Sequence, residues 1–183
     1  MNIRQAGWKD LFGSIHSRGI GGADPAWAQI LTSALWAYNF SASSMQQIWV
    51  VYHIPHDYLP GTAMYAHTHW IQNGTNTGNC IWGFEWAYAK GYEQMAFPIE
   101  STTTVRVTQA GSNTAWMHHI AEVSIADVIP STNLETDGLI IMRVFRDATN
   151  VLDTLTDTAF LLLADLHYQS DKEATPNKNY PFF

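Results

Sequence analysis

From residue 35 onward, the chain alternates apolar runs rich in β-branched and aromatic residues with short segments of Gly, Pro, Asn, Asp and Ser. In one run, Trp82, Phe84 and Trp86 fall on one face of an extended chain while Gly83 and Glu85 fall on the other. A period of two indicates strands rather than helices. The pattern predicts eight strands, at Leu35–Ser41, Gln46–Ile54, Thr62–Ile71, Asn79–Ala89, Thr102–Thr108, Ala115–Val123, Leu139–Arg146 and Ala159–Gln169.

The number and spacing of these strands predict the fold class. Eight strands in succession, separated by turn segments such as Pro55–Gly61 and Gln72–Gly78 and with almost no helical pattern between them, indicate an all-β protein. An eight-stranded jelly-roll sandwich fits this count best. We therefore expect one jelly-roll domain over residues 35–169.

The two ends of the chain predict extensions of that domain. Residues 1–34 are expected to form an irregular arm with one short helix over Pro25–Ala34, because Asp24 can cap a helix and Pro25 suits its first position. Residues 170–183 are polar but end in aromatic residues, so an extended tail is expected. We expect this tail to dock on its own domain or on a neighbouring subunit through three side chains, Tyr180, Phe182 and Phe183.

Charge is distributed unevenly along the 183 residues. Between Ala26 and Phe84, a stretch of 59 residues, Asp57 is the only Asp, Glu, Lys or Arg. Residues 1–84 carry three basic and three acidic side chains, so the net charge of −7 falls entirely in the remainder. A chain with 14% charged residues, against roughly 25% in typical proteins, is expected to cover part of its surface with a partner.

Composition also argues against several classes of function. The nine basic residues are never adjacent, so no patch for nucleic acid or for an anionic membrane is expected. No apolar run approaches the roughly 20 residues of a membrane-spanning helix, and the first ten residues lack the apolar core of an export signal. The single Cys80 excludes an intramolecular disulfide. Synthesis in a reducing cytoplasm is the simplest expectation.

The candidate chemistry centres on His67 and His69. In a strand, both imidazoles project from one face, where two neutral imidazoles can bind a divalent transition metal if further ligands are present. Glu85, His119 or His167 would be candidates for those ligands. The plain alternative is a pair of hydrogen-bonded polar residues without a metal.

The segment from Gly61 to His69 resembles the opening of the first cupin motif, Gly-x5-His-x-His. Cupins are jelly-roll proteins, and the resemblance implies a metal-dependent enzyme with its metal inside the jelly roll. The chain departs from the motif because Asn73 and Gly74 stand where a cupin has Glu, and no second His motif follows. His-x-His pairs also resemble those of phage tail fibres, in which three chains each donate one pair to a metal on a threefold axis.

Other catalytic patterns are sparse. Cys80 lies within an apolar strand and is expected to be buried and structural. Glu85 and Glu93 could form the paired carboxylates of a glycosidase, but a place in the core and rim of a sandwich explains the region more simply. His118 and His119 should point to opposite faces of a strand, so they form no site alone. We expect no enzymatic activity.

Several segments spread from residue 8 to the C-terminus resemble a family of small virion proteins of tailed double-stranded DNA phages. They are Trp8–Arg18, Asp24–Trp27, Tyr52–Pro60, His67–Asn79, Phe84–Phe97, Val144–Asp147, Asp165–Ser170 and the Asn-Lys-Asn-x-Pro-x-Phe-like end. The resemblance implies a jelly-roll protein of the virion that assembles as a homotrimer. Its position would be that of a capsid cement (decoration) protein bound to the major capsid protein, or of a component associated with the tail or fibre.

Two further hypotheses remain open. Trp and Tyr side chains could serve as stacking platforms for a receptor or glycan. His67 and His69 could instead make a subunit interface sensitive to pH, since imidazole titrates near neutrality.

Overall fold

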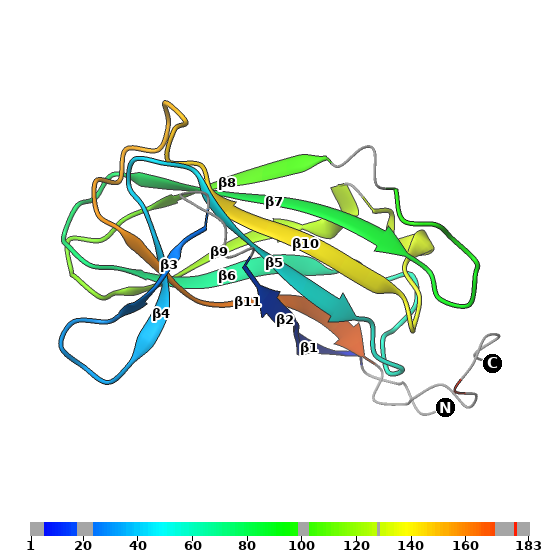
Figure 1. Cartoon of the computed structure of the whole chain (residues 1–183). Helices are drawn as coiled ribbons and strands as arrows, with labels where there is room; N and C mark the ends of the chain where they lie inside the picture. The colour runs from blue at the N-terminus through cyan, green and yellow to red at the C-terminus, as the bar shows by residue number, and fades with distance from the viewer. Residues whose placement is uncertain (1–5, 18–23, 99–102, 128, 171–177, 179–183) are drawn as a thin grey trace.

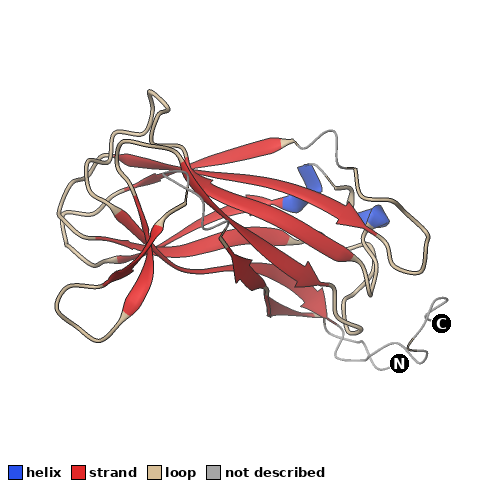
Figure 2. Cartoon of the chain, viewed as in Figure 1, coloured by secondary structure: helices blue, strands red, loops and turns tan. Residues whose placement is uncertain are grey.

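The computed structural model describes residues 6–17, 24–98, 103–127, 129–170 and 178. The predicted tail contacts Tyr180, Phe182 and Phe183 lie outside these residues. Figure 2 shows an almost wholly β structure. The elements are β1 (Gly7–Phe12), β2 (Ser14–His16), β3 (Ala26–Gln29), β4 (Trp36–Phe40), β5 (Gln46–His53), β6 (Tyr65–Gln72), β7 (Asn79–Ala89), β8 (Thr104–Ala110), β9 (His118–Ser124), the short 3₁₀ turns η2 (Ile125–Asp127) and η3 (Ser131–Asn133), β10 (Leu139–Arg146) and β11 (Ala159–Ser170).

Two antiparallel sheets face each other across one core (Figure 1). The first, sheet A, has the order β3-β4-β11-β6-β9, and the second, sheet B, has the order β2-β5-β10-β7-β8. The eight strands from β4 to β11 are divided as in a jelly roll, with β4, β6, β9 and β11 in sheet A and β5, β7, β8 and β10 in sheet B. The sequence prediction of an all-β jelly-roll sandwich is confirmed, and the expected bounds of β7 and β10 agree with the structure.

The core lies between the sheets and is built from alternate residues of each strand. Trp70 of sheet A and Trp82 of sheet B are fully buried with ring centroids 6.0 Å apart, and Phe40 packs edge-on against Trp82 at 5.1 Å. At Gly83, on the opposite face of β7, an added Cβ would lie 2.1 Å from the Phe145 ring, so the aromatic side chain needs glycine there.

The prediction of a short helix over Pro25–Ala34 is wrong. Residues Ala26–Gln29 form β3, which pairs with β4 so that Trp27 lies opposite Tyr38, with ring centroids 4.9 Å apart. Asp24-Pro25 is a local helix-start signal, but so short a helix has little stability without a face to bury. The segment instead pairs with β4 as a strand, and a turn at Leu31 (φ 55) closes the hairpin.

The start of the chain adds two strands that the sequence pattern did not predict. β1 pairs with the second half of β11 in sheet A, and β2 pairs with β5 in sheet B. Between them, Gly13 crosses from one sheet to the other so closely that a Cβ would lie 2.5 Å from Cγ1 of Val50. Lys9 of β1 also contacts the carboxylate of Asp57, which fixes the arm to the loop before β6.

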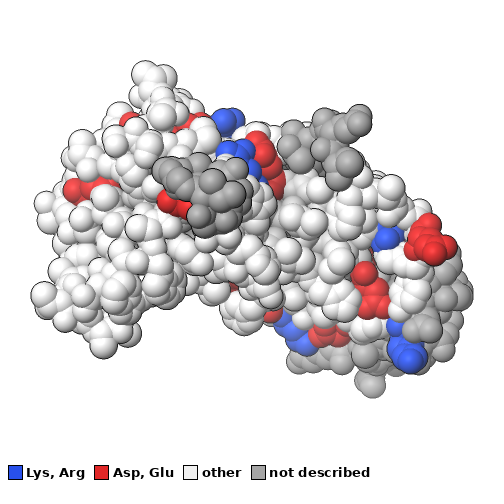
Figure 3. Space-filling model, in the orientation of Figure 1, with Lys and Arg blue, Asp and Glu red and all other residues white. Residues whose placement is uncertain are grey.

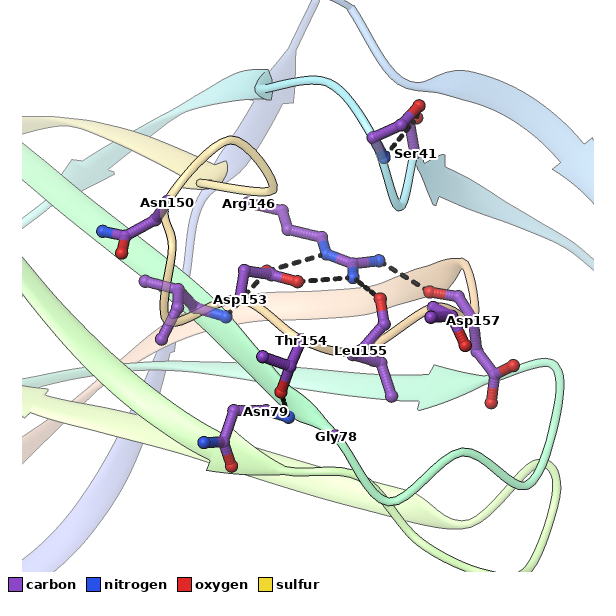
Figure 4. Close-up of polar contacts among 12 residues, drawn as sticks. Ser41, Gly78, Asn79, Arg146, Asn150, Asp153, Thr154, Leu155 and Asp157 are labelled. Carbon is purple, nitrogen blue, oxygen red and sulfur yellow. Dashed lines mark hydrogen bonds and ion pairs between the residues drawn. The ribbon is translucent and has the colours of Figure 1, made fainter.

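A buried ion pair fixes the long loop between β10 and β11 (Figure 4). Arg146 is fully buried, and it donates from Nε and Nη2 to the two carboxylate oxygens of Asp153 at 3.1 and 2.9 Å. It also donates to the carbonyl oxygens of Leu155 and Asp157. Asp153 in turn accepts a hydrogen bond from the backbone N–H of Ile81 at 3.0 Å, so the loop is tied to β7.

Candidate functional site

His67 and His69 both point to the outer face of sheet A, away from the core. Strand β6 places Ala66 and Trp70 in the core, and the alternation of the strand sends the two histidines to the opposite side. Their Nε2 atoms are 2.9 Å apart. The expectation that the two imidazoles share one face is confirmed. The pair therefore does not lie inside the jelly roll, where a cupin-type metal centre was expected.

The strands on either side of β6 bring two more side chains to the pair. Asp165 of β11 lies directly opposite His67 in the register, and its Oδ1 is 3.0 Å from Nε2 of His67 and 3.6 Å from Nε2 of His69. His118 of β9 approaches from the other side, with its Nε2 atom 2.8 Å from Nδ1 of His69. Three strands therefore contribute to one cluster, which we call the His67 cluster: His67, His69, His118 and Asp165.

The inner part of the His67 cluster is unusually dry for charged groups. The side chains of His67 and Asp165 are 1% and 2% exposed, and that of His69 is 22% exposed. Within the described residues, Asp165 has no Lys or Arg ion-pair partner, and its Oδ1 has no hydrogen-bond partner despite its closeness to His67. A carboxylate in such a place is costly unless a cation lies beside it.

The electrostatic setting keeps His69 neutral. Burial lowers the pKa of His69 below its ordinary value; Asp165 opposes this shift, while the neighbouring His67 and His118 add to it. A neutral imidazole keeps a lone pair on one ring nitrogen, which is the form that binds metals. The imidazole of His69 is therefore suited to act as a ligand at neutral pH.

A second polar group lies beside the cluster on the same face. The ring of His167 of β11 lies against that of His67 at a tilt of 44° with centroids 4.0 Å apart, and Nδ1 of His167 lies 3.2 Å from Oε2 of Glu122. These three residues could also hold a metal ion, but their set shares His67 with the first one. An open hollow of about 550 Å³ lies beside His167. Four residues line it: Trp8, Tyr65, Glu122 and His167.

The other residues singled out in the sequence do not join the cluster. Glu85 belongs to sheet B, where Arg143 donates to it at 2.9 Å; burial would raise its pKa, but hydrogen bonds from Thr104 and Arg143 lower it overall. His119 turns inward and stacks on Trp70 at 4.5 Å, as the alternation with His118 predicts. Cys80 is buried as expected, and burial raises the pKa of its thiol to about 12.

Sequence reasoning missed two members of the cluster. Asp165 stands in a segment that contributed only to the family resemblance, and His118 was set aside because its neighbour His119 points the other way. Both become part of the site through the registers β6–β11 and β6–β9, which place residues from distant segments side by side. His167, which the sequence had named as a candidate ligand, does lie against His67.

Comparisons with known proteins give a distant structural likeness for this chain. No family model matches it, and no curated protein matches it. A solved structure titled "X-ray crystal structure of a non-crystalline cellulose specific carbohydrate-binding module: CBM28" is similar over 80% of this chain and 77% of that chain, with 10% identity and a TM-score of 0.31. A likeness this distant bears neither on the fold nor on the function of this chain. Within the described residues, no helix is long and apolar enough to cross a membrane.

Proposed function

We propose that this chain is a non-enzymatic structural protein of a tailed double-stranded DNA phage, a capsid cement protein that acts as a homotrimer and stabilises the head. The assignment to a virion draws on the sequence segments that resemble the phage family from residue 8 to the C-terminus. The assignment to an assembly subunit draws on the surface of the β3–β4 hairpin. That surface is the observation that carries the proposal.

The β3–β4 hairpin extends from the body of the sandwich at the lower left of Figure 1. Four large apolar side chains of the hairpin are exposed to solvent: Trp27 is 58% exposed, Leu31 62%, Leu35 66% and Trp36 51%. The same part of the molecule is uncharged in Figure 3, and the sequence from Ala26 to His56 contains no Asp, Glu, Lys or Arg. Exposed apolar patches of this kind mark protein contacts.

Other copies of this chain are the partners that best fit this hairpin. Each chain carries a net charge of −7, so two copies repel each other wherever their acidic parts meet. Contact through the neutral hairpin avoids that repulsion and buries the exposed indoles. β3 is also an edge strand of sheet A in the described part of the chain, so it offers backbone groups to a neighbour.

Binding to purified phage heads tests the proposal. The chain should co-sediment with heads of its phage from which the native copies have been stripped, and it should raise the temperature at which those heads release DNA. A matched variant, Trp27→Gln with Trp36→Gln, should bind less tightly, whereas Trp8→Gln, which alters an equally exposed indole on β1, should bind normally. A chain that stays monomeric and leaves the heads untouched would refute the proposal.

A second candidate function is supported by the hollow lined by Trp8, Tyr65, Glu122 and His167. Trp8 and Tyr65 meet edge to face with centroids 5.6 Å apart, and 54% of Trp8 is exposed, so its indole is accessible to a ligand. Aromatic faces beside a carboxylate are a suitable platform for a sugar ring. A tail-associated protein that binds receptor glycans would use this hollow. A glycan array that stays blank with wild-type protein would remove this candidate.

A further inference from the structure

We propose that the His67 cluster is a zinc site contained within a single chain, with Nε2 of His67, Nε2 of His69 and Oδ1 of Asp165 as ligands and His118 as the residue that orients His69. The proposal differs from a metal shared on a threefold axis, and it does not depend on the assembly role proposed above.

The spacing of the three donor atoms fits a small tetrahedral ion. They are 2.9, 3.0 and 3.6 Å from one another. A circle through three points with these separations has a radius of about 1.9 Å, slightly less than the zinc–ligand lengths of about 2.0–2.2 Å. An ion at bonding distance from all three would therefore lie just outside their plane, as in a tetrahedral site with its fourth corner free.

The bonding of the donors also favours a cation over a plain hydrogen-bond network. Oδ1 of Asp165 is buried beside an imidazole nitrogen and yet has no hydrogen-bond partner among the described residues. Beside it, Nε2 of His67 and Nε2 of His69 face each other at 2.9 Å. Only one of the two nitrogens can carry a proton that points to the other. A divalent ion would satisfy all three atoms and balance the buried carboxylate.

The surroundings of His69 resemble those of a histidine in a protein zinc site. A histidine that binds a metal commonly donates its other ring N–H to an acceptor, and Nδ1 of His69 has Nε2 of His118 at 2.8 Å for that purpose. His67 and Asp165 are nearly inaccessible, whereas His69 is partly exposed. The fourth position therefore opens toward His69, where water would complete the coordination. Two imidazoles and one carboxylate form a donor set that suits zinc.

The alternative set of His67, Glu122 and His167 is less suited to the ion. His167 is already engaged outside that set, with its Nε2 atom 2.9 Å from Oδ1 of Asp10. Glu122 is also exposed, with 46% of its side chain accessible. Both sets require His67, so only one of them can hold an ion. The set with Asp165 is proposed because its carboxylate is buried, whereas that of Glu122 is exposed.

Zinc titration of the untagged, full-length chain tests the site. Chelator-treated protein should bind one zinc ion per chain by calorimetry and by elemental analysis after gel filtration, and cobalt in its place should give the intense visible bands of a four-coordinate centre. His69→Gln and Asp165→Asn should each weaken zinc binding at least tenfold. His53→Gln, a change at an exposed histidine of β5, serves as the control and should leave binding unchanged.

The possible outcomes separate the hypotheses. One zinc per chain that is lost in both ligand variants and kept in His53→Gln supports the site. No zinc retained by the wild-type chain, or zinc retained equally by folded His69→Gln and Asp165→Asn, overturns it. One zinc per three chains overturns it as well, because that ratio belongs to a threefold axis. Far-ultraviolet circular dichroism of each variant establishes that a loss of zinc does not reflect unfolding.

Discussion

Nδ1 of His69 lies 2.8 Å from Nε2 of His118, across the pairing of β6 with β9. In the proposed zinc site this contact fixes the ring of His69 without touching the ion. We predict that His118→Gln weakens zinc binding by roughly 10–100-fold while leaving one ion per chain at saturation. Calorimetry with zinc chloride measures the change. An affinity equal to that of the wild type would show that His118 has no orienting role.

The buried pair of Arg146 and Asp153 should be a major determinant of stability. Asp153→Asn leaves the fully buried guanidinium without its charged partner, and we expect the free energy of unfolding to fall by about 3–5 kcal/mol. Urea denaturation followed by tryptophan fluorescence measures this difference. Arg106→Gln is the comparison, because the Arg106 side chain is 43% exposed although its partner Asp147 is buried, and its loss should lower stability less than Asp153→Asn does. Equal losses in the two variants would contradict this account of the loop.

Acid should loosen the N-terminal arm through Asp57. Burial would raise the pKa of Asp57, but hydrogen bonds from Lys9, Tyr168 and Ser170 lower it overall below its ordinary value. A carboxyl whose pKa is depressed by folding stabilises the native state above its unfolded pKa of about 3.9, and that contribution is lost as the pH falls through the lower, folded value.

The corresponding variant is Asp57→Asn. It should be less stable than the wild type at neutral pH, and the difference should shrink as the solution is acidified below about pH 4. Urea denaturation at a series of pH values gives both curves, with Glu93→Gln, in an exposed turn, as the control. A difference that stays constant across the acid range would show that the charge of Asp57 is irrelevant.

Cys80 should be inert in the folded protein. Burial raises the pKa of its thiol to about 12, which leaves a thiolate population roughly a thousandfold below that of an ordinary cysteine. A thiol-specific reagent should label the native chain very slowly and the urea-unfolded chain at once. Rapid labelling of the native chain would mean that β7 opens readily at Cys80.

The jelly roll could be predicted from the sequence because apolar residues recur regularly at alternate positions of its strands. In β7 and β10, apolar side chains recur at every second position between clear turns, so even the bounds were predictable. The region before residue 35 lacks that pattern. β3 exists because Trp27 finds Tyr38 across the hairpin, and a local helix-start signal at Asp24-Pro25 cannot anticipate that pairing.

The candidate site was predictable only in part. The His67–His69 spacing reveals a shared face because it depends on the geometry of one strand. Asp165 and His118 enter through the registers of two other strands, and a bulge between Leu161 and Leu163 shifts β11 before it reaches the site. Such a shift moves every later side chain to the other face, so no spacing rule applied to one segment could have named Asp165.

The mass of the chain in solution tests the central claim, assembly through the β3–β4 hairpin, most directly. Sedimentation equilibrium at neutral pH should give about 62 kDa, three times the 20.6 kDa of one chain. The double variant Trp27→Gln, Trp36→Gln should shift toward the monomer, while Trp8→Gln should remain trimeric. A wild-type chain that sediments at 20.6 kDa at all concentrations, or a trimer that the double variant leaves intact, would contradict the account.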